Sequence, residues 1–443
     1  MQHSYDASDR PGGFSRIHLT APLRHRDFGL LWAGQTISLL GDGVFLVAMA
    51  WQAYTISNAP SALSVVGIAM TVPTVVLLLA GGVVSDRIDR RRVLLAADLV
   101  RGLAVLTLAV LSVSGALELW HMCALVAVYG AGTAFFGPAF DAIVPDLLPE
   151  SELAQANSLD QFVRPIAFRL AGPALGGWLV AALGVGPAFA VDALSFALSA
   201  VMVLCIRTRV TRAEAAGSVA DDLRQGFRFV RSNVWLWGTL VSAAFAYLLF
   251  LGPVEVLLPF VVKNDLHGSA AELGVVFAAG GIGSVGAAVL MSELGQPRRT
   301  ITVIYATWTL ATLAVAGYGL ATAGWQLMAA SLAFNALETV GTIVWVTLKQ
   351  REVPASMLGR VSSLDWLISI GLLPLSFALT APLASAVGAQ TTLVAAGLAG
   401  AAVTMAALLL PGMFDVERPQ ATPVRLPASE PAPAKPRSSS EAA

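Results

Sequence analysis

The stretch PESELAQANSLD, residues 149–160, recurs 205 residues later as PASMLGRVSSLD, residues 354–365, with six of twelve positions identical. A more diverged pair precedes it in each half of the chain, GGVVSDRIDRRR (81–92) and AVLMSELGQPRRT (288–300). Both pairs separate long apolar runs. A repeat of this kind predicts two equivalent halves, and membrane transporters are commonly built from such repeated helical units.

The apolar runs indicate that the halves lie in a membrane. The 443 residues are 56% hydrophobic and 12% charged, with a mean hydropathy of +0.73, which excludes an ordinary water-soluble domain. Runs of about 20 apolar residues, enough to cross a bilayer as a helix, recur along nearly the whole chain. We therefore expect an all-α integral membrane protein with about twelve spans, at residues 28–56, 62–84, 93–114, 119–141, 158–182, 187–207, 233–262, 271–293, 300–320, 324–348, 361–384 and 391–412.

The polar segments divide the spans six and six. The sequence predicts a cytoplasmic N-tail (1–27), two six-helix bundles (28–207 and 233–412) joined by a cytoplasmic linker (208–232), and a disordered cytoplasmic tail (413–443). Of the 27 Lys and Arg residues, 23 fall in segments on the side of the N-terminus. Because basic residues accumulate on the cytoplasmic side, both termini are expected there, in the cytoplasmic (inner) membrane of a bacterium.

The sequence lacks the motifs of an enzyme or an ATP-driven pump. No lysine follows a Gly-x-x-x-x-Gly pattern, there is no His-Glu-x-x-His, and the two cysteines, Cys123 and Cys205, lie far apart in apolar runs. We therefore expect no enzymatic activity, cofactor, metal or nucleic-acid partner. Energy for transport would come from an ion gradient or from the gradient of the substrate itself.

The loop after the second span carries a recognisable motif. Gly82-x-x-x-Asp86-Arg87-x-x-Arg90-Arg91 resembles the signature loop of the major facilitator superfamily, with Asp89 where a glycine is usual. The resemblance extends over roughly residues 24–412 and implies two six-helix bundles related by pseudo-twofold symmetry. In this interpretation the loop is a conformational latch, whose Asp and Arg side chains bond neighbouring helix ends in one state. The alternative is that the arginines only fix the topology.

A second motif bears on the direction of transport. RLAGPALGGWLV (169–180) resembles the core of a motif found in exporters of the superfamily, with Gly172 and Pro173 breaking the helix and Gly176 and Gly177 allowing close packing against the opposite bundle. Other stretches resemble the drug:proton antiporter branch that includes macrolide, tetracycline and enterobactin exporters. The resemblance implies proton-coupled efflux of a drug, antibiotic or siderophore by alternating access. Import of a nutrient and flipping of a lysolipid are the alternatives, and a non-transporting receptor is a remote one.

Ionisable residues inside spans are candidates for function because burying them is costly. At about 1.5 Å per residue, Asp42, Arg169 and Glu338 lie roughly 16–20 Å into their helices, near mid-membrane. With Asn335, one turn from Glu338, they form the predicted central set. Asp42 or Glu338 would carry the coupled proton, although Asp42 could instead form a permanent ion pair or a packing hydrogen bond.

Other charges are expected to have structural roles. Asp98 and Arg101 are three residues apart and should pair locally, and Asp192 should make a helix contact near the outer end of its span, on a helix that faces lipid or the bundle exterior in this superfamily. In place of the arginine that many drug antiporters have in the fourth span, this chain has Val126, so a coupling scheme that uses that arginine does not transfer.

The substrate site should be largely apolar and aromatic. The candidate substrate contacts are Trp51, Tyr54, Phe135, Phe136, Phe245, Tyr247, Glu255 and Trp345. The expected partners are a small organic substrate, protons and the lipid bilayer, and the protein is expected to work as a monomer.

Overall fold

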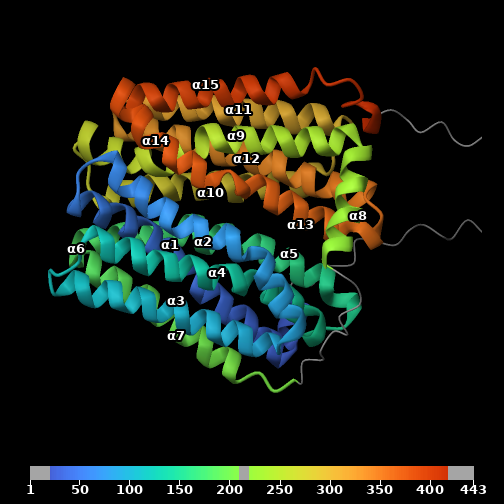
Figure 1. Ribbon diagram of the computed structural model, residues 1–443, viewed down its shortest axis with the longest axis horizontal. Helices are drawn as coiled ribbons and strands as arrows, with labels where there is room; N and C mark the ends of the chain where they lie inside the picture. The colour runs from blue at the N-terminus through green and yellow to red at the C-terminus, as the bar shows by residue number, and fades with distance from the viewer. Residues whose placement is uncertain (1–19, 209–218, 418–443) are drawn as a thin grey trace, which may run out of the picture.

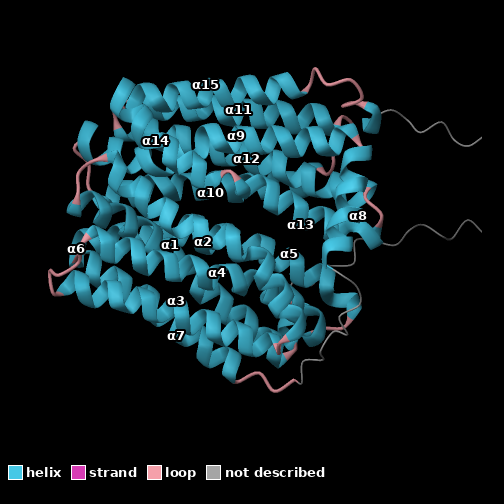
Figure 2. Ribbon diagram, in the orientation of Figure 1, coloured by secondary structure: helices cyan, strands magenta, loops and turns pink. Residues whose placement is uncertain are grey.

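A computed structural model describes residues 20–208 and 219–417, and the predictions for the two ends of the chain lie largely outside these residues. The described chain is helical with short loops and contains no strand (Figure 2). Within these residues, twelve helical segments are long and apolar enough to cross a membrane, which confirms the predicted number of spans. Helices suit this setting because every backbone polar group within lipid must be paired inside the protein.

The spans form two bundles that lie side by side (Figure 1). The first bundle, called the N-half, contains α1 (Arg26–Ile56), α2 (Pro60–Arg87), α3 (Arg90–Val113), α4 (Leu119–Leu147), α5 (Leu153–Arg164), α6 (Gly172–Leu183) and α7 (Val185–Leu204). The second, called the C-half, contains α9 (Val234–Phe260), α10 (Ala270–Leu294), α11 (Thr300–Leu320), α12 (Gly324–Glu352), α13 (Ala355–Gly371), α14 (Leu373–Val387) and α15 (Ala389–Ala407).

Two equivalent spans are interrupted. The fifth consists of α5, a π-helical segment at Pro165–Ala171, and α6, whereas the eleventh consists of α13 and α14 with a break at Leu372. Each interrupted span turns into the next helix at a glycine with positive φ, Gly184 (91°) and Gly388 (88°). Only glycine adopts this backbone conformation without strain, so the same turn is built at matching places in the two halves.

The linker contains a helix that hydropathy did not reveal. Helix α8 (Val219–Ser232) runs across the direction of the spans at one end of the molecule (Figure 1). Its sequence, VADDLRQGFRFVRS, is polar overall, and its apolar residues are spaced for one helical face, so a search for long apolar runs misses it.

The hydrophobic core is continuous across the halves at only one end. One cluster of buried residues, which includes Val44, Tyr54, Val256 and Leu273, draws on both halves on the predicted outer side. Toward the predicted cytoplasmic side there are two separate clusters, one from the N-half and one from the C-half and the linker helix α8. Among the described residues, the buried clusters therefore join the halves on the predicted outer side and not on the other.

Candidate functional site

At mid-span the two halves meet through three polar side chains. Arg169 and Glu338 are the central residues of their spans, Gln155–Leu183 and Gly324–Glu352. Arg169 Nη1 donates to Asn335 Oδ1 at 2.8 Å and lies 3.8 Å from Glu338 Oε2. The Arg169 side chain is 44% exposed although it lies between the halves, and that of Glu338 is 20% exposed. Because the buried clusters of the two halves are separate on the predicted cytoplasmic side of Arg169 and Glu338, these side chains border solvent-accessible space.

The irregular fifth span places Arg169. Arg169 belongs to the π-helical segment, and Pro173, four residues later, has no N–H to bond the Arg169 carbonyl. That carbonyl faces Gly281 on α10, where an added Cβ would lie 2.6 Å from the oxygen. The sequence predicted a break in the helix at Gly172 and Pro173. The structure places the distorted segment just before them, at Pro165–Ala171.

Helix α12 holds the two partners of Arg169 on one face. Asn335 Nδ2 donates to the Ser331 carbonyl at 2.9 Å, and Thr342 Oγ1 donates to Glu338 Oε1 at 3.0 Å. The Glu338 carboxylate thus accepts a hydroxyl from its own helix and faces a guanidinium from the opposite half. Such an ion pair can form in one conformation and break in another.

A pocket inside the C-half reaches the same carboxylate. It has about 410 Å³ of empty space, including its open mouth, and lies between α9, α11, α12 and α15. Its lining is aromatic and small, with Glu338 and a few hydroxyls as the polar groups: Ser242, Ala243, Ala246, Tyr247, Phe250, Trp308, Ala311, Thr312, Phe334, Glu338 and Thr404. Glu338 therefore lies between this pocket and Arg169.

Asp42 makes a hydrogen bond with a neighbouring helix, one of the alternatives that the sequence left open. Its Oδ1 accepts the Tyr129 hydroxyl of α4 at 2.6 Å, and the Tyr129 ring stacks on Phe45 with ring centroids 4.8 Å apart. Arg169 pairs with Glu338 instead. Of the four predicted central residues, the structure joins Arg169, Asn335 and Glu338 and leaves Asp42 within the N-half. Tyr129 was not predicted, although it lies one turn beyond Val126.

The N-half also contains a buried network of charged side chains, centred on Asp98 and Arg101. Arg101 Nη2 bonds Asp98 Oδ1 at 2.5 Å, Ser199 Oγ donates to Asp98 Oδ2 at 2.7 Å, and the guanidinium lies 4.2 Å from the Phe136 ring centre. Asp98 and Arg101 are 1% and 3% exposed, so the predicted local pair is part of the N-half core. Asp192 is fully buried against α1, so the expected helix contact is present, and its side chain faces the interior of the N-half rather than lipid.

The signature loop bonds its own half in this conformation. Arg90 Nη1 donates to the Ala142 carbonyl at 2.9 Å and lies 2.5 Å from Asp146 Oδ2, both on α4. Arg91 donates to the carbonyls of Val203 and Leu204 at the end of α7. Arg87 is exposed, Gly82 has open space around it, and the side chain of Asp86 lies outside the described part. Arg90 and Arg91 thus bond helix ends of their own half, and the role of the loop as a latch stays a prediction.

The glycines of α6, in the fifth span, divide their contacts between the halves. Gly177 meets the opposite half, where an added Cβ would lie 2.7 Å from the Ala270 carbonyl oxygen and 2.9 Å from Gly274 Cα. Gly172 and Gly176 instead pack against α1 of their own half, so the expectation that Gly176 contacts the opposite bundle is wrong. Successive residues on a helix are about 100° apart, and adjacent glycines face different neighbours.

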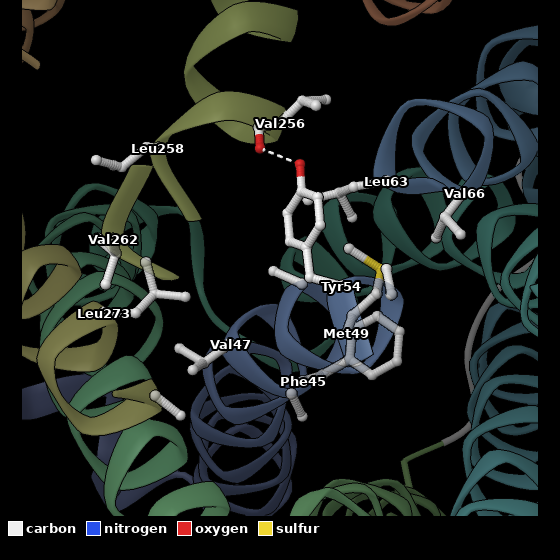
Figure 3. Packing of buried hydrophobic residues seen from close by; sticks show 14 of the residues in the cluster. Phe45, Val47, Met49, Tyr54, Leu63, Val66, Val256, Leu258, Val262 and Leu273 are labelled. Carbon is white, nitrogen blue, oxygen red and sulfur yellow. Dashed lines mark hydrogen bonds between the residues drawn. The ribbon is translucent and has the colours of Figure 1, made fainter. Parts of the chain in front are cut away.

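The closed end is held by hydrogen bonds between the first helices of the two halves. Tyr54 Oη donates to the Val256 carbonyl at 2.6 Å, among buried apolar side chains (Figure 3). Lys263 Nζ donates to the Tyr54 carbonyl at 2.5 Å, and Asn58 Nδ2 donates to Asn264 Oδ1 at 2.6 Å. Tyr54 is therefore part of the closure in this conformation.

The other candidate substrate contacts fall into two groups. Phe136 and Trp345 are buried in packing contacts, and Trp345 Nε1 donates to Asp365 Oδ2 at 3.1 Å. More accessible residues are Trp51, Phe135, Phe245, Tyr247 and Glu255. Tyr247 lines the pocket beside Glu338, and Phe245 is 50% exposed. Their role in substrate binding stays a prediction.

Comparisons with known proteins agree with this architecture. The model of a family described as transmembrane secretion effector matches residues 17–431. Macrolide efflux protein A of Streptococcus pyogenes is 23% identical over 88% of this chain and 96% of its own length. Multidrug efflux pump Tap of Mycolicibacterium fortuitum is 27% identical over 85% of this chain and 94% of its own.

Solved structures share the fold. A bacterial homologue of the iron transporter ferroportin, in an inward-facing state, has a TM-score of 0.66 at 15% identity, covering 86% of this chain and 98% of that one. A bacterial homologue of the lysosomal transporter Spinster, also inward-facing, has a TM-score of 0.63 at 15% identity, covering 93% and 100%.

Proposed function

Because the chain belongs to the transmembrane secretion effector family of the major facilitator superfamily, we propose that it is a secondary active transporter that exports a moderately large organic molecule in exchange for protons. The observation that carries the proposal is the cluster of Arg169, Asn335 and Glu338. It lies at mid-span between two halves that pack together at one end only. Relatives named for macrolide and multidrug efflux support export and a drug-like substrate.

The mechanism is alternating access between the halves. In the state described, the contacts of Tyr54 and Asn58 with the C-half close the predicted outer side, and the cytoplasmic side is open. Rocking of the halves would break these contacts and bring the cytoplasmic ends together. The arginines of the signature loop, which bond their own half here, would then be able to engage the ends of the opposite helices.

Proton coupling would use Glu338, with Asp42 as the second candidate. A proton on Glu338 removes its attraction to Arg169, which releases this contact between side chains and lets the halves rock about mid-span. Asp42 lies one residue from the middle of α1 and has a hydroxyl donor rather than a cation as its hydrogen-bond partner, so it would exchange a proton without breaking a contact between halves. Both termini would be cytoplasmic, in the inner membrane.

The test is accumulation of radiolabelled erythromycin, a macrolide, in an efflux-deficient bacterial host. We expect expression to lower accumulation and a protonophore to restore it. Glu338→Gln or Asp42→Asn should abolish the effect of the pH gradient, whereas Glu293→Gln, at an exposed carboxylate on α10, should not. If both Glu338→Gln and Asp42→Asn retained full gradient-driven efflux, the proton assignment would be wrong. Higher accumulation on expression would indicate import and overturn export.

A further inference from the structure

Helix α8 is held at the boundary of the membrane by its connection to α9. A single residue, Asn233, separates the end of α8 at Ser232 from the start of the span at Val234. Helix α8 crosses the direction of the spans, as Figure 1 shows, and therefore lies roughly parallel to the membrane surface. Its C-terminal half cannot be far from the lipid headgroups.

One face of α8 rests on the C-half. Gly226 and Val230 are buried, and an added Cβ at Gly226 would lie 3.2 Å from both Arg360 Cβ and Leu364 Cδ1 of α13. Arg360 Nη1 also donates to Gln225 Oε1 at 2.9 Å. The helix is thus fixed against the cytoplasmic part of the eleventh span.

The opposite face is basic and carries an exposed aromatic ring. Arg224, Arg228 and Arg231 are exposed and spaced by four and three residues, which aligns them along one side of the helix. Phe227 is 57% exposed and lies at the edge of this side, three residues after Arg224 and four before Arg231. The acidic residues of the helix, Asp221 and Asp222, are in its first turn, so its positive charge is concentrated in the part next to the span.

We propose that α8 is an interfacial helix that binds anionic phospholipid headgroups through Arg224, Arg228 and Arg231, with Phe227 inserted at the boundary between headgroups and acyl chains. Three aligned arginines complement anionic phosphates, and an exposed Phe among them suits a lipid boundary better than water. A soluble acidic protein could also bind the three arginines. Such a partner would not explain why they lie beside the start of a membrane span, whereas lipid headgroups would. Bound lipid would hold α8, and through it α13, in place.

The test uses the full chain purified in detergent and titrated with phosphatidylglycerol or phosphatidylcholine, with bound lipid counted by native mass spectrometry. Each arginine near an anionic surface contributes about fivefold in affinity. The triple variant Arg224→Gln, Arg228→Gln, Arg231→Gln should therefore bind phosphatidylglycerol about 100-fold more weakly at low salt. The triple variant Arg224→Lys, Arg228→Lys, Arg231→Lys keeps the three positive charges on the helix, so it is the matched control and should bind phosphatidylglycerol within a few-fold of the parent.

A second measurement reports insertion independently of charge. In a background with Cys123→Ser and Cys205→Ser, an environment-sensitive fluorophore on Phe227→Cys should shift to the blue when nanodiscs of phosphatidylcholine are enriched in phosphatidylglycerol. The proposal is overturned if the triple variant binds phosphatidylglycerol like the parent, if phosphatidylcholine binds equally well, or if the fluorophore stays in water. Binding of soluble polyglutamate in preference to phosphatidylglycerol would instead identify an acidic protein partner and also overturn it.

Discussion

Replacing Gly177 with alanine would put a methyl group between the two halves of the protein. The added Cβ would lie 2.7 Å from the Ala270 carbonyl oxygen and 2.9 Å from Gly274 Cα, and both are backbone atoms that cannot rotate away. Forcing extra atoms into a packed contact costs about 1–3 kcal/mol. Under alternating access this cost applies only while the outer side is closed. The ratio of closed to open molecules should therefore fall by about 5- to 150-fold.

The assay is cross-linking of Asn58→Cys with Asn264→Cys, whose parent side chains are hydrogen-bonded at 2.6 Å. With Cys123 and Cys205 replaced by serine, the bridging rate measures how often the outer side is closed. Gly177→Ala should slow bridging in proportion to the lost closed population. Gly286→Ala is the control, because its added Cβ on α10 meets nothing within 4 Å. Equal bridging rates in the two variants would refute the reasoning.

Two further substitutions test the buried polar contacts of the N-half, both measured by thermal unfolding in detergent. Asp98→Asn should lower the free energy of unfolding by about 3–5 kcal/mol because it leaves the Arg101 charge buried without its counter-charge, whereas Asp160→Asn, in an exposed pair, should change it by less than about 1 kcal/mol. Tyr129→Phe should cost about 1–3 kcal/mol because the Asp42 carboxylate loses its hydroxyl donor, and an unchanged melting temperature would place a different donor beside Asp42.

Most of the fold could be predicted because a bilayer imposes strong constraints on sequence. Apolar runs of spanning length gave the twelve helices, and the repeat at residues 149–160 and 354–365 gave the two halves. Helix α8 could not be found in this way, since it is only 14 residues long and polar overall. An amphipathic helix is recognised by the period of its pattern rather than by mean hydropathy.

The depth of the candidate site residues in the membrane could be predicted, but the direction in which their side chains point could not. Distance along a helix placed Arg169 and Glu338 at mid-span, and the structure brings them together with Asn335. The same measure placed Asp42 at that depth, yet its side chain points to Tyr129 within the N-half. Position along the chain fixes height in the membrane, whereas the partner depends on rotation about the helix axis and on the neighbouring helix.

The Arg169 contact suggests why the fifth span is irregular. In a regular helix the Arg169 carbonyl would accept the N–H of residue 173, but Pro173 has none, and Gly281 of the opposite half lies close to this oxygen. The side chain of the same residue crosses the interface to Glu338. One residue thus joins the halves through both backbone and side chain, at the depth where their relative motion is smallest in a rocking mechanism. A proton that releases the side chain would leave the backbone contact as the pivot.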